Sequence, residues 1–235
     1  GESVFEQCIK LTSINIPNNL TNIPNSVFKN CSSLTKVDIP DGVSSIGEKA
    51  FLDCINLTEI SLPNSIGSIG SFCFLFCISL KEVVILNEVI VLASSVFSGC
   101  ENLISVEIPD GLIKIEKYAF NLCSSLINLD IPDGVSSIGE KAFNECKSLD
   151  FIKLPNSLEV IPKSCFLECS ELPEIALPTN LLEISAGAFS GCTSLKEISL
   201  PNSLRTIGNS AFWKCTELSE IRIPPMVQTV GVKAF

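Results

Sequence analysis

The chain lacks histidine entirely, and it has only one tryptophan, one tyrosine and one methionine. Without histidine, the commonest general base and the commonest metal ligand of proteins are both missing. Glycine-rich phosphate-binding and dinucleotide-binding motifs are missing as well. The sequence therefore does not predict an enzyme, and we expect neither a metal site nor a cofactor.

Positive charge and long apolar segments are also scarce. The chain carries 16 Lys and Arg against 26 Asp and Glu, for a net charge of −10, so nucleic acids and anionic membrane surfaces are poor partners. No apolar run approaches the roughly 18 residues of a membrane span, and no secretory signal opens the sequence, so we expect no direct membrane insertion. With 46% hydrophobic residues, the chain has enough apolar material for a continuous core.

An internal repeat dominates what is present. Phenylalanine recurs every 23 residues without insertion or deletion, at Phe5, Phe28, Phe51, Phe74, Phe97, Phe120, Phe143, Phe166, Phe189, Phe212 and Phe235. A cysteine follows three residues later in every complete unit, at Cys8, Cys31, Cys54, Cys77, Cys100, Cys123, Cys146, Cys169, Cys192 and Cys215. Such self-similarity is typical of a solenoid in which each repeat forms one coil.

Each unit also predicts its local structure. A leucine lies six residues after the phenylalanine, and aliphatic residues follow at nine, eleven, fifteen and eighteen, as in Val37, Ile39, Val43 and Ile46. The alternation up to Ile39 indicates one short strand per coil, which a proline then ends. A second short strand around 43–46 is possible. Apolar spacing of three and four in A-F-x-x-C favours a helical or 3₁₀ turn on the opposite side.

Stacked coils would pair their strands in parallel at about 4.8 Å, so ten coils predict a sheet roughly 50 Å long. We expect residues 1–235 to form a single solenoid of about ten repeats. Polar, divergent end repeats are missing, which suggests an excised fragment capable of end-to-end self-association. The fourth unit is the least regular, because Leu86 replaces the proline that the other units carry.

The unit from Leu126 to Cys146 reads L-x-x-L-x-I-P-x-x-V-x-x-I-G-x-x-A-F-x-x-C and resembles the BspA-type leucine-rich repeat. The resemblance covers essentially the whole chain and implies a leucine-rich-repeat solenoid. It also implies surface or secreted proteins of host-associated bacteria and parasitic protists, which adhere to host matrix or to other cells. The unit lacks the asparagine that usually follows the strand, so we expect no buried asparagine ladder there.

The cysteine series allows three interpretations. A metal array is disfavoured because structural zinc sites need converging C-x₂₋₄-C pairs, and stacked cysteines would instead point the same way. Disulfides are disfavoured by the same parallel geometry, although a local Cys73–Cys77 link is conceivable. We favour small, buried, apolar side chains inside the coils.

The outward strand positions, eight and ten residues after each phenylalanine, are the predicted binding surface. They hold the candidate residues Asp38, Glu59, Glu82, Val84, Glu107, Asp130, Phe151, Lys153, Glu174, Glu197 and Glu220. The excess of carboxylates over Lys36, Lys153 and Arg222 favours a basic partner. Alternatively, these charges only keep an exposed sheet soluble.

Phe151 is the sharpest exception on this polar surface, together with Val84 and Ala176. An exposed aromatic side chain can anchor a partner, and Phe151 is the best single candidate for that role. Scattered exposed apolar residues are also ordinary on protein surfaces, so this interpretation competes with a structural one.

The sequence thus favours an adhesin-like module that binds a protein or glycan ligand, with host matrix or a cell surface among the candidates, at the cell surface or after secretion. An intracellular scaffold in the cytoplasm, with reduced thiols, is one alternative, and a self-assembling repeat array is another. Triplets for N-glycosylation begin at Asn19, Asn30 and Asn56, but the repeat consensus generates such triplets by itself.

Overall fold

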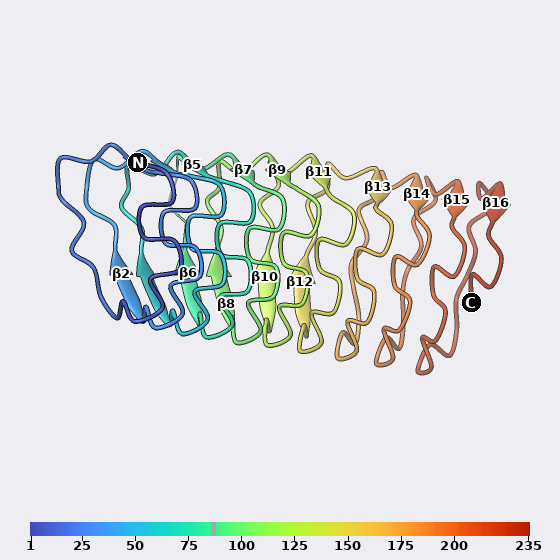
Figure 1. The fold of residues 1–235 in the computed structure, drawn as a ribbon. Helices are drawn as coiled ribbons and strands as arrows, with labels where there is room; N and C mark the ends of the chain where they lie inside the picture. Colours follow the sequence, from blue (N-terminus) through green and yellow to red (C-terminus); the bar gives the residue numbers. More distant parts are fainter. Residues whose placement is uncertain (86–87) are drawn as a thin grey trace.

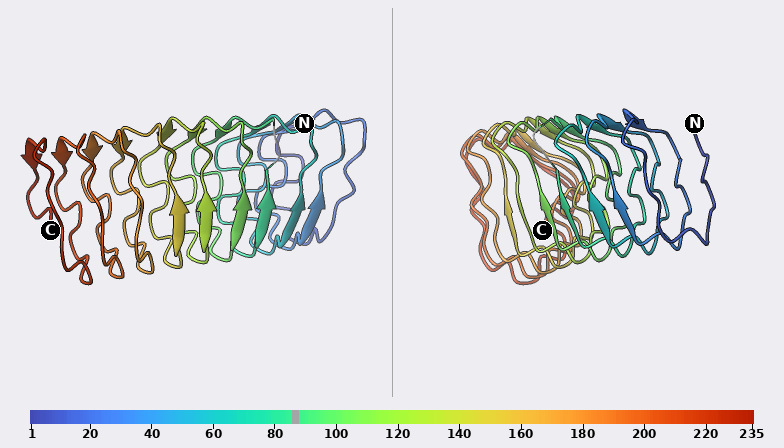
Figure 2. Two further views of the ribbon diagram at one scale, coloured as in Figure 1. Left: turned by 180° about the vertical axis from the view of Figure 1, so that it is seen from behind. Right: turned by 90° about the vertical axis from the view of Figure 1, so that its left-hand side faces the viewer.

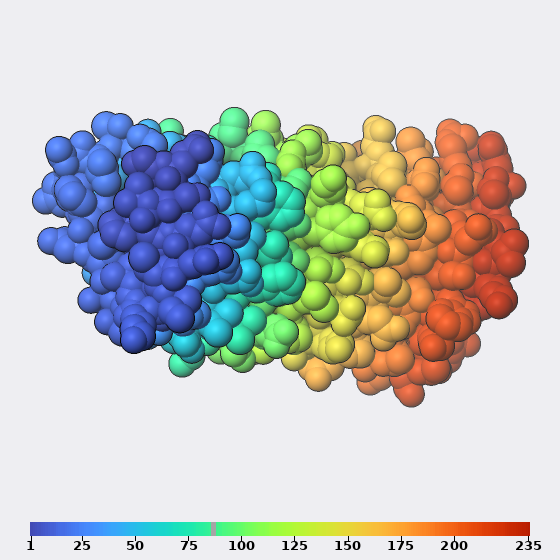
Figure 3. Space-filling model, viewed as in Figure 1, coloured from blue at the N-terminus to red at the C-terminus, as the bar shows by residue number. Residues whose placement is uncertain are grey.

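The computed structural model describes residues 1–85 and 88–235. Each 23-residue repeat forms one coil, and the coils stack into an elongated rod with the two chain termini toward opposite ends (Figure 1). In the space-filling view the side chains fill the spaces between coils, and the rod is continuous from blue to red (Figure 3). Leu86, the irregular residue of the fourth unit, lies outside the described residues.

The first set of strands follows the repeat leucine. Its members are β2 (Lys36–Asp38), β4 (Glu59–Ser61), β6 (Glu82–Val84), β8 (Ser105–Glu107), β10 (Asn128–Asp130) and β12 (Phe151–Lys153). They pair in parallel as β2–β4, β6–β8 and β10–β12, with each residue opposite the one 23 positions later, as in Lys36 and Glu59. The middle residue of each strand is buried, and one or both of its neighbours point into solvent.

Beyond β12 this set is reduced to one isolated parallel bridge between Glu174 and Glu197. The residue seven positions after the repeat phenylalanine normally donates its N–H to the preceding coil, as Asp150 does to the Ile127 carbonyl at 2.8 Å. Pro173 occupies this position in the eighth coil and has no N–H to donate. Before this point the pairs β2–β4, β6–β8 and β10–β12 are already separate sheets, so the predicted continuous sheet of ten coils is wrong for this side of the rod.

A second set of strands precedes each repeat phenylalanine, as the sequence allowed. It comprises β1 (Asn22–Ile23), β3 (Ser45–Ile46), β5 (Ser68–Ile69), β7 (Val91–Leu92), β9 (Lys114–Ile115), β11 (Ser137–Ile138), β13 (Val160–Ile161), β14 (Glu183–Ile184), β15 (Thr206–Ile207) and β16 (Thr229–Val230). These form parallel sheets of three, three and four strands. Figure 2 shows the two sets on separate sides of the stack.

The expected helical or 3₁₀ turn on the opposite side is wrong: the described residues contain no helix of either kind. Instead, residues two positions before and after each repeat phenylalanine adopt left-handed backbone, as Lys141 (φ 55°) and Glu145 (φ 58°) do around Phe143. The N–H groups of these three residues donate to carbonyls of the next coil at 2.7–3.1 Å. Bonds between coils thus replace the bonds that a helix would make within its own turn.

The core is organised around the repeat phenylalanines. Neighbouring rings stack with centroids 5.3–5.6 Å apart, at interplanar angles of 2–21°. From Phe51 to Phe189 the rings are completely buried. Burial of such a side chain stabilises a fold by roughly 1.5–3 kcal/mol, and an offset-stacked pair adds roughly 0.5–1.5 kcal/mol. These gains offset the roughly 1–2 kcal/mol that each left-handed non-glycine residue costs.

A short polar ladder interrupts the apolar interior beside this column. Asn144 Nδ2 donates to Asn121 Oδ1 at 2.7 Å, and Asn121 Nδ2 donates to Ser98 Oγ at 3.0 Å. The next coil carries Leu167 at this position, so the buried Asn144 Oδ1 has no partner among the described residues. The ladder lies one residue after the phenylalanine and not after the strand, so it differs from the asparagine ladder whose absence was predicted from the missing asparagine after the strand.

Replacing Phe143 with alanine should lower the free energy of unfolding by about 3–5 kcal/mol, because it removes two stacked contacts and opens a cavity. Phe151→Ala is the matched control: this ring is 52% exposed, and its loss should cost within about 0.5 kcal/mol. Urea unfolding of both variants measures the difference. Equal losses would show that the phenylalanine column does not determine stability.

Replacing Ser210 with glycine should stabilise the protein by about 0.5–1 kcal/mol, because Ser210 holds left-handed backbone (φ 53°) without a side-chain hydrogen bond among the described residues. Gly187 already occupies the equivalent position one coil earlier, at φ 65°. Ser105→Gly, in the extended strand β8, should instead destabilise by a similar amount. Thermal unfolding should show a higher midpoint for Ser210→Gly and a lower midpoint for Ser105→Gly. A lower midpoint in both variants would contradict the claim that left-handed backbone at Ser210 costs stability.

Candidate binding surface

Every candidate residue from the sequence lies on one side of the rod, which we call the strand face. It consists of the residues eight and ten positions after each repeat phenylalanine. The structure exposes all eleven candidates: Asp38, Glu59, Glu82, Val84, Glu107, Asp130, Phe151, Lys153, Glu174, Glu197 and Glu220. The inward residues between them pack in the core, so the strand face is a set of side chains on a rigid support.

Charges on the N-terminal part of the strand face are partly neutralised. Lys36 Nζ lies 3.7 Å from Asp38 Oδ1 and 3.5 Å from Glu59 Oε2, so one lysine bridges two coils. Ser61 Oγ also donates to Asp38 Oδ1 at 3.0 Å. These two carboxylates therefore already have partners within the chain.

The remaining carboxylates of the strand face form no ion pair within residues 1–85 and 88–235. They are Glu82, Glu107, Asp130, Glu174, Glu197 and Glu220. Lys153, the one lysine near them on this face, lies 3.8 Å from Asp133, in the turn that follows β10 one coil earlier. Most of the strand face thus carries uncompensated negative charge.

Shallow depressions interrupt this surface. One of about 570 Å³ is lined by Phe151, Lys153, Glu174, Ala176 and Glu197. Ala176 has only a methyl group where neighbouring coils carry longer side chains, and Pro173 interrupts the strand pairing at the same place. A hollow therefore forms beside the Phe151 ring.

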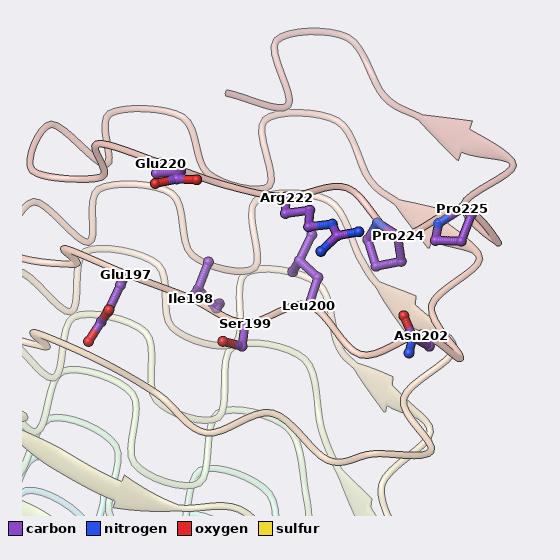
Figure 4. A pocket seen from close by; sticks show the side chains of 9 residues that line it. All are labelled: Glu197, Ile198, Ser199, Leu200, Asn202, Glu220, Arg222, Pro224 and Pro225. Carbon is purple, nitrogen blue, oxygen red and sulfur yellow. The ribbon is translucent and has the colours of Figure 1, made fainter.

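A second depression lies one coil further along and is shown in Figure 4. Glu197 and Glu220 line one end of it, and Arg222 extends toward Pro224 at the other end (Figure 4). No ion pair joins Arg222 to either glutamate in the described part of the chain. The glutamates at this end of the strand face are therefore also available to a cation from outside.

Sequence reasoning missed two exposed residues next to the strand face, Ile104 and Ile127, which are 41% and 43% exposed. They lie seven positions after their phenylalanines, whereas the predicted binding surface comprises positions eight and ten. Position seven holds polar residues or proline in the other coils, as at Thr35 and Thr58. Isoleucine at this position in two consecutive coils therefore departs from the repeat pattern, and this departure could have indicated an exposed apolar site.

The cysteines are a structural element and not part of the surface. Ten of the twelve are buried, Cys215 is half-buried and Cys8 is exposed, and all are free thiols. Each buried repeat thiol donates to the carbonyl of the phenylalanine one coil earlier, as Cys123 Sγ does to Phe97 at 3.1 Å. The predicted role as small buried residues is confirmed for these ten, and the thiols additionally bond neighbouring coils.

Burial also suppresses thiol chemistry. It raises the pKa of Cys123 and Cys169 well above the ordinary value of 9.0, and it raises the pKa of the half-buried Cys215 to about 12. A reactive or metal-binding cysteine needs a thiolate, which these environments disfavour. The described residues contain no group of three or more side chains that could together hold a metal ion.

The stack of 23-residue coils, with its leucine-lined core and parallel strands, defines the class as a leucine-rich-repeat solenoid, a repeat-based interaction module. More specifically, the chain belongs to the family of the BspA type leucine-rich repeat region, whose model matches residues 1–127 and 113–235. A comparison with curated proteins finds no match. The part of the chain that the structure describes has no helix with the length and hydropathy of a membrane span.

Solved structures support the same assignment. A leucine-rich repeat protein of Bacteroides ovatus is 35% identical with a TM-score of 0.81, covering 84% of this chain and 53% of its own. The chain thus spans about half the length of that protein. The T. pallidum leucine-rich repeat protein is 31% identical with a TM-score of 0.58, covering 79% and 78%. A Eubacterium ventriosum leucine-rich repeat protein, at 20% identity and a TM-score of 0.63, shares the fold.

The free energy of unfolding should fall steeply as the pH rises above about 9, the ordinary thiol pKa. Burial raises the folded-state pKa of the thiols, so the unfolded chain releases protons that the folded chain retains, and stability present below this pH is lost above it. Each fully buried thiol contributes about 0.7 kcal/mol per pH unit at pH 9, and this slope rises toward about 1.4 kcal/mol per pH unit at higher pH. Urea titrations between pH 8 and 10 measure the slope.

The control for this prediction is the variant Cys123→Ala with Cys146→Ala, which has two fewer buried thiols. Its stability should be lower at pH 8, but its decline, averaged between pH 8 and 10, should be shallower by about 1.4 kcal/mol per pH unit. An identical slope in both proteins would mean that the thiols titrate alike in the folded and unfolded chains.

Proposed function

We propose that this chain is an adhesin-like interaction module that binds a protein or glycan ligand through its strand face. The observation that carries the proposal is the row of six carboxylates without an ion pair in the described structure, which extends from Glu82 to Glu220. Stacked phenylalanine, cysteine and leucine positions occupy the interior. The outward strand side chains are therefore the surface that can vary to suit a ligand.

The sign of this charge favours a basic ligand. Complementary charge accelerates encounter more than it increases final affinity, and the effect weakens as ionic strength rises. Nucleic acids are disfavoured by the same negative field. We also propose no catalytic role, because carboxylate catalysis needs enclosed groups with divergent pKa values, whereas these lie on open depressions.

Membership of the BspA-type family supports a place at the cell surface or outside the cell, with host matrix among the candidate ligands. The free thiols favour one alternative, a cytoplasmic scaffold, because disulfides are rare in reducing compartments. Either location uses the same strand face, so the binding proposal does not depend on the choice.

The test compares two variants of equal charge on immobilised extracellular-matrix proteins and glycans. The first, E82Q/E107Q/D130N/E174Q, neutralises four strand-face carboxylates; the control, D41N/E101Q/D110N/E171Q, neutralises four exposed carboxylates elsewhere. Surface plasmon resonance at low salt should show the association rate of the first variant reduced at least about tenfold, and that of the control within about twofold of wild type.

Equal binding by wild type and both variants would exclude the strand face as the site. Binding by none of the three to any ligand of the panel would contradict the adhesin-like function itself. Circular dichroism of each variant confirms that the coils remain folded.

A further inference from the structure

Five consecutive coils each expose one apolar side chain on or beside the strand face. These residues, Val84, Ile104, Ile127, Phe151 and Ala176, are called the apolar stripe. The four larger ones are 41–52% exposed. The neighbouring coils on either side carry polar residues at positions seven, eight and ten, such as Glu59, Ser61 and Ser199. The stripe is therefore a local feature of the fourth to eighth coils and not a property of the repeat.

Backbone hydrogen bonds place three members of the stripe, Ile104, Ile127 and Phe151, in adjacent coils side by side. The Ile127 N–H donates to the Ile104 carbonyl at 3.2 Å, and the Phe151 N–H donates to the Ile127 carbonyl at 3.3 Å. Val84 pairs in register with Glu107, three residues along the chain from Ile104, and Val84 and Ile104 line the same depression. Four steps of about 4.8 Å give the stripe a length of about 19 Å along the rod. Contiguous exposed apolar surface of this kind commonly marks a contact site.

Negative charge flanks the stripe within the same coils. Glu82 and Glu107 lie beside its first part, Asp130 beside its middle and Glu174 beside its end, and none forms an ion pair in the described residues. An apolar centre with a carboxylate rim is complementary to a segment with an apolar face and cationic edges. It is not complementary to an anionic lipid surface.

Depressions lie near both ends of the stripe. Val84 and Ile104 line one, together with Glu59 and Glu82, and Phe151 and Ala176 line the other. Val84 and Ile104 each lie three coil steps before their counterparts in the other depression, Phe151 and Ala176, which is about 14 Å. A partner can therefore insert one apolar side chain near each end while its middle lies over Ile127.

This spacing matches an α-helix that lies along the rod. Each helical turn advances about 5.4 Å, close to one coil step of about 4.8 Å, and three turns advance about 16 Å. In an extended segment, side chains on one side repeat about every 6.7 Å, which fits the coil step less well. A helix about 10 Å wide also covers the lateral spread of the stripe from position seven to position ten.

We propose that the apolar stripe is the docking site for a cationic amphipathic helix of a protein partner. The helix lies along the rod, places its apolar face over Ile104, Ile127 and Phe151, and directs lysine or arginine side chains to the flanking carboxylates. This inference rests on the proposed function, and it specifies the kind of ligand that the strand face takes.

The probe is a synthetic 18-residue peptide with leucine or phenylalanine at i, i+4, i+7 and i+11 and lysine at both edges of that face. A peptide of identical composition, rearranged so that apolar residues alternate with lysine, is the extended control. Fluorescence anisotropy should show at least tenfold tighter binding of the helical peptide, and circular dichroism should show its helicity rising in the complex. Equal or tighter binding of the alternating peptide would overturn the helical assignment.

The location is tested with matched protein variants. I104S/I127S should weaken binding of the helical peptide at least tenfold, whereas I55S/I90S, which alters two exposed isoleucines away from the strand face, should leave it within twofold. Unchanged binding by I104S/I127S, or association of the chain with anionic phosphatidylserine vesicles in preference to the peptide, would overturn the proposal.

The same variants separate this inference from the proposed function. If I104S/I127S binds a matrix ligand like wild type while E82Q/E107Q/D130N/E174Q does not, the helix-docking inference fails and the strand-face function stands. If neither variant changes matrix binding, the proposed function fails.

Discussion

Stacking of one phenylalanine ring on the next determines the position of everything else in this molecule. The rings keep a nearly constant spacing of 5.3–5.6 Å from Phe5 to Phe235, so each coil is held in register with its neighbours. The cysteine thiols reinforce this register, because each buried repeat thiol donates to a phenylalanine carbonyl one coil earlier. Left-handed residues on both sides of each ring turn the chain sharply enough to place the ring inside.

The packed interior holds the strand face in position, whereas the outward side chains of the strand face pack little against that interior. From Asp38 to Lys153 the side chains of the strand face stand on strands of three residues whose central members pack in the core. Substitution of an outward residue therefore changes charge or apolarity at one coil while the neighbouring coils keep their positions. This separation explains how the fourth to eighth coils can carry an apolar stripe while the second and third carry mainly polar residues at the same positions.

The fold could be predicted from the sequence because the 23-residue spacing, the buried positions and the strand after Leu34 all follow from local patterns. The backbone around each repeat phenylalanine could not be predicted, because the apolar spacing of A-F-x-x-C also suits the helical turn that was expected there. Hydrogen bonds between coils decide the outcome there, and they favour left-handed backbone even at Lys141 and Tyr118 (φ 60°). The interruption at Pro173 was visible in the sequence, but its effect on strand pairing depends on the neighbouring coil.

The exposed positions of the strand face could also be predicted from local patterns. All candidate residues proved exposed on one side, since alternation along a strand determines which side chains point outward. Ile104 and Ile127 were missed because their exposure depends on where the strand begins, one residue later than the position they occupy. The binding role of these residues stays a proposal.

The hydrogen bonds between coils have a consequence for how such chains change in length. Most coils present the same pattern of N–H donors and carbonyl acceptors to the coil before and the coil after. The Phe143 N–H, for example, donates to the Cys165 carbonyl of the next coil, and the Gly139 N–H donates to the Ile115 carbonyl of the preceding coil. Duplication or loss of a 23-residue unit would leave these bonds matched and would shift the far part of the rod by about 4.8 Å. A gain of one residue would instead displace every later ring from the column. Recombination between repeats can therefore change the reach of the molecule in whole coils.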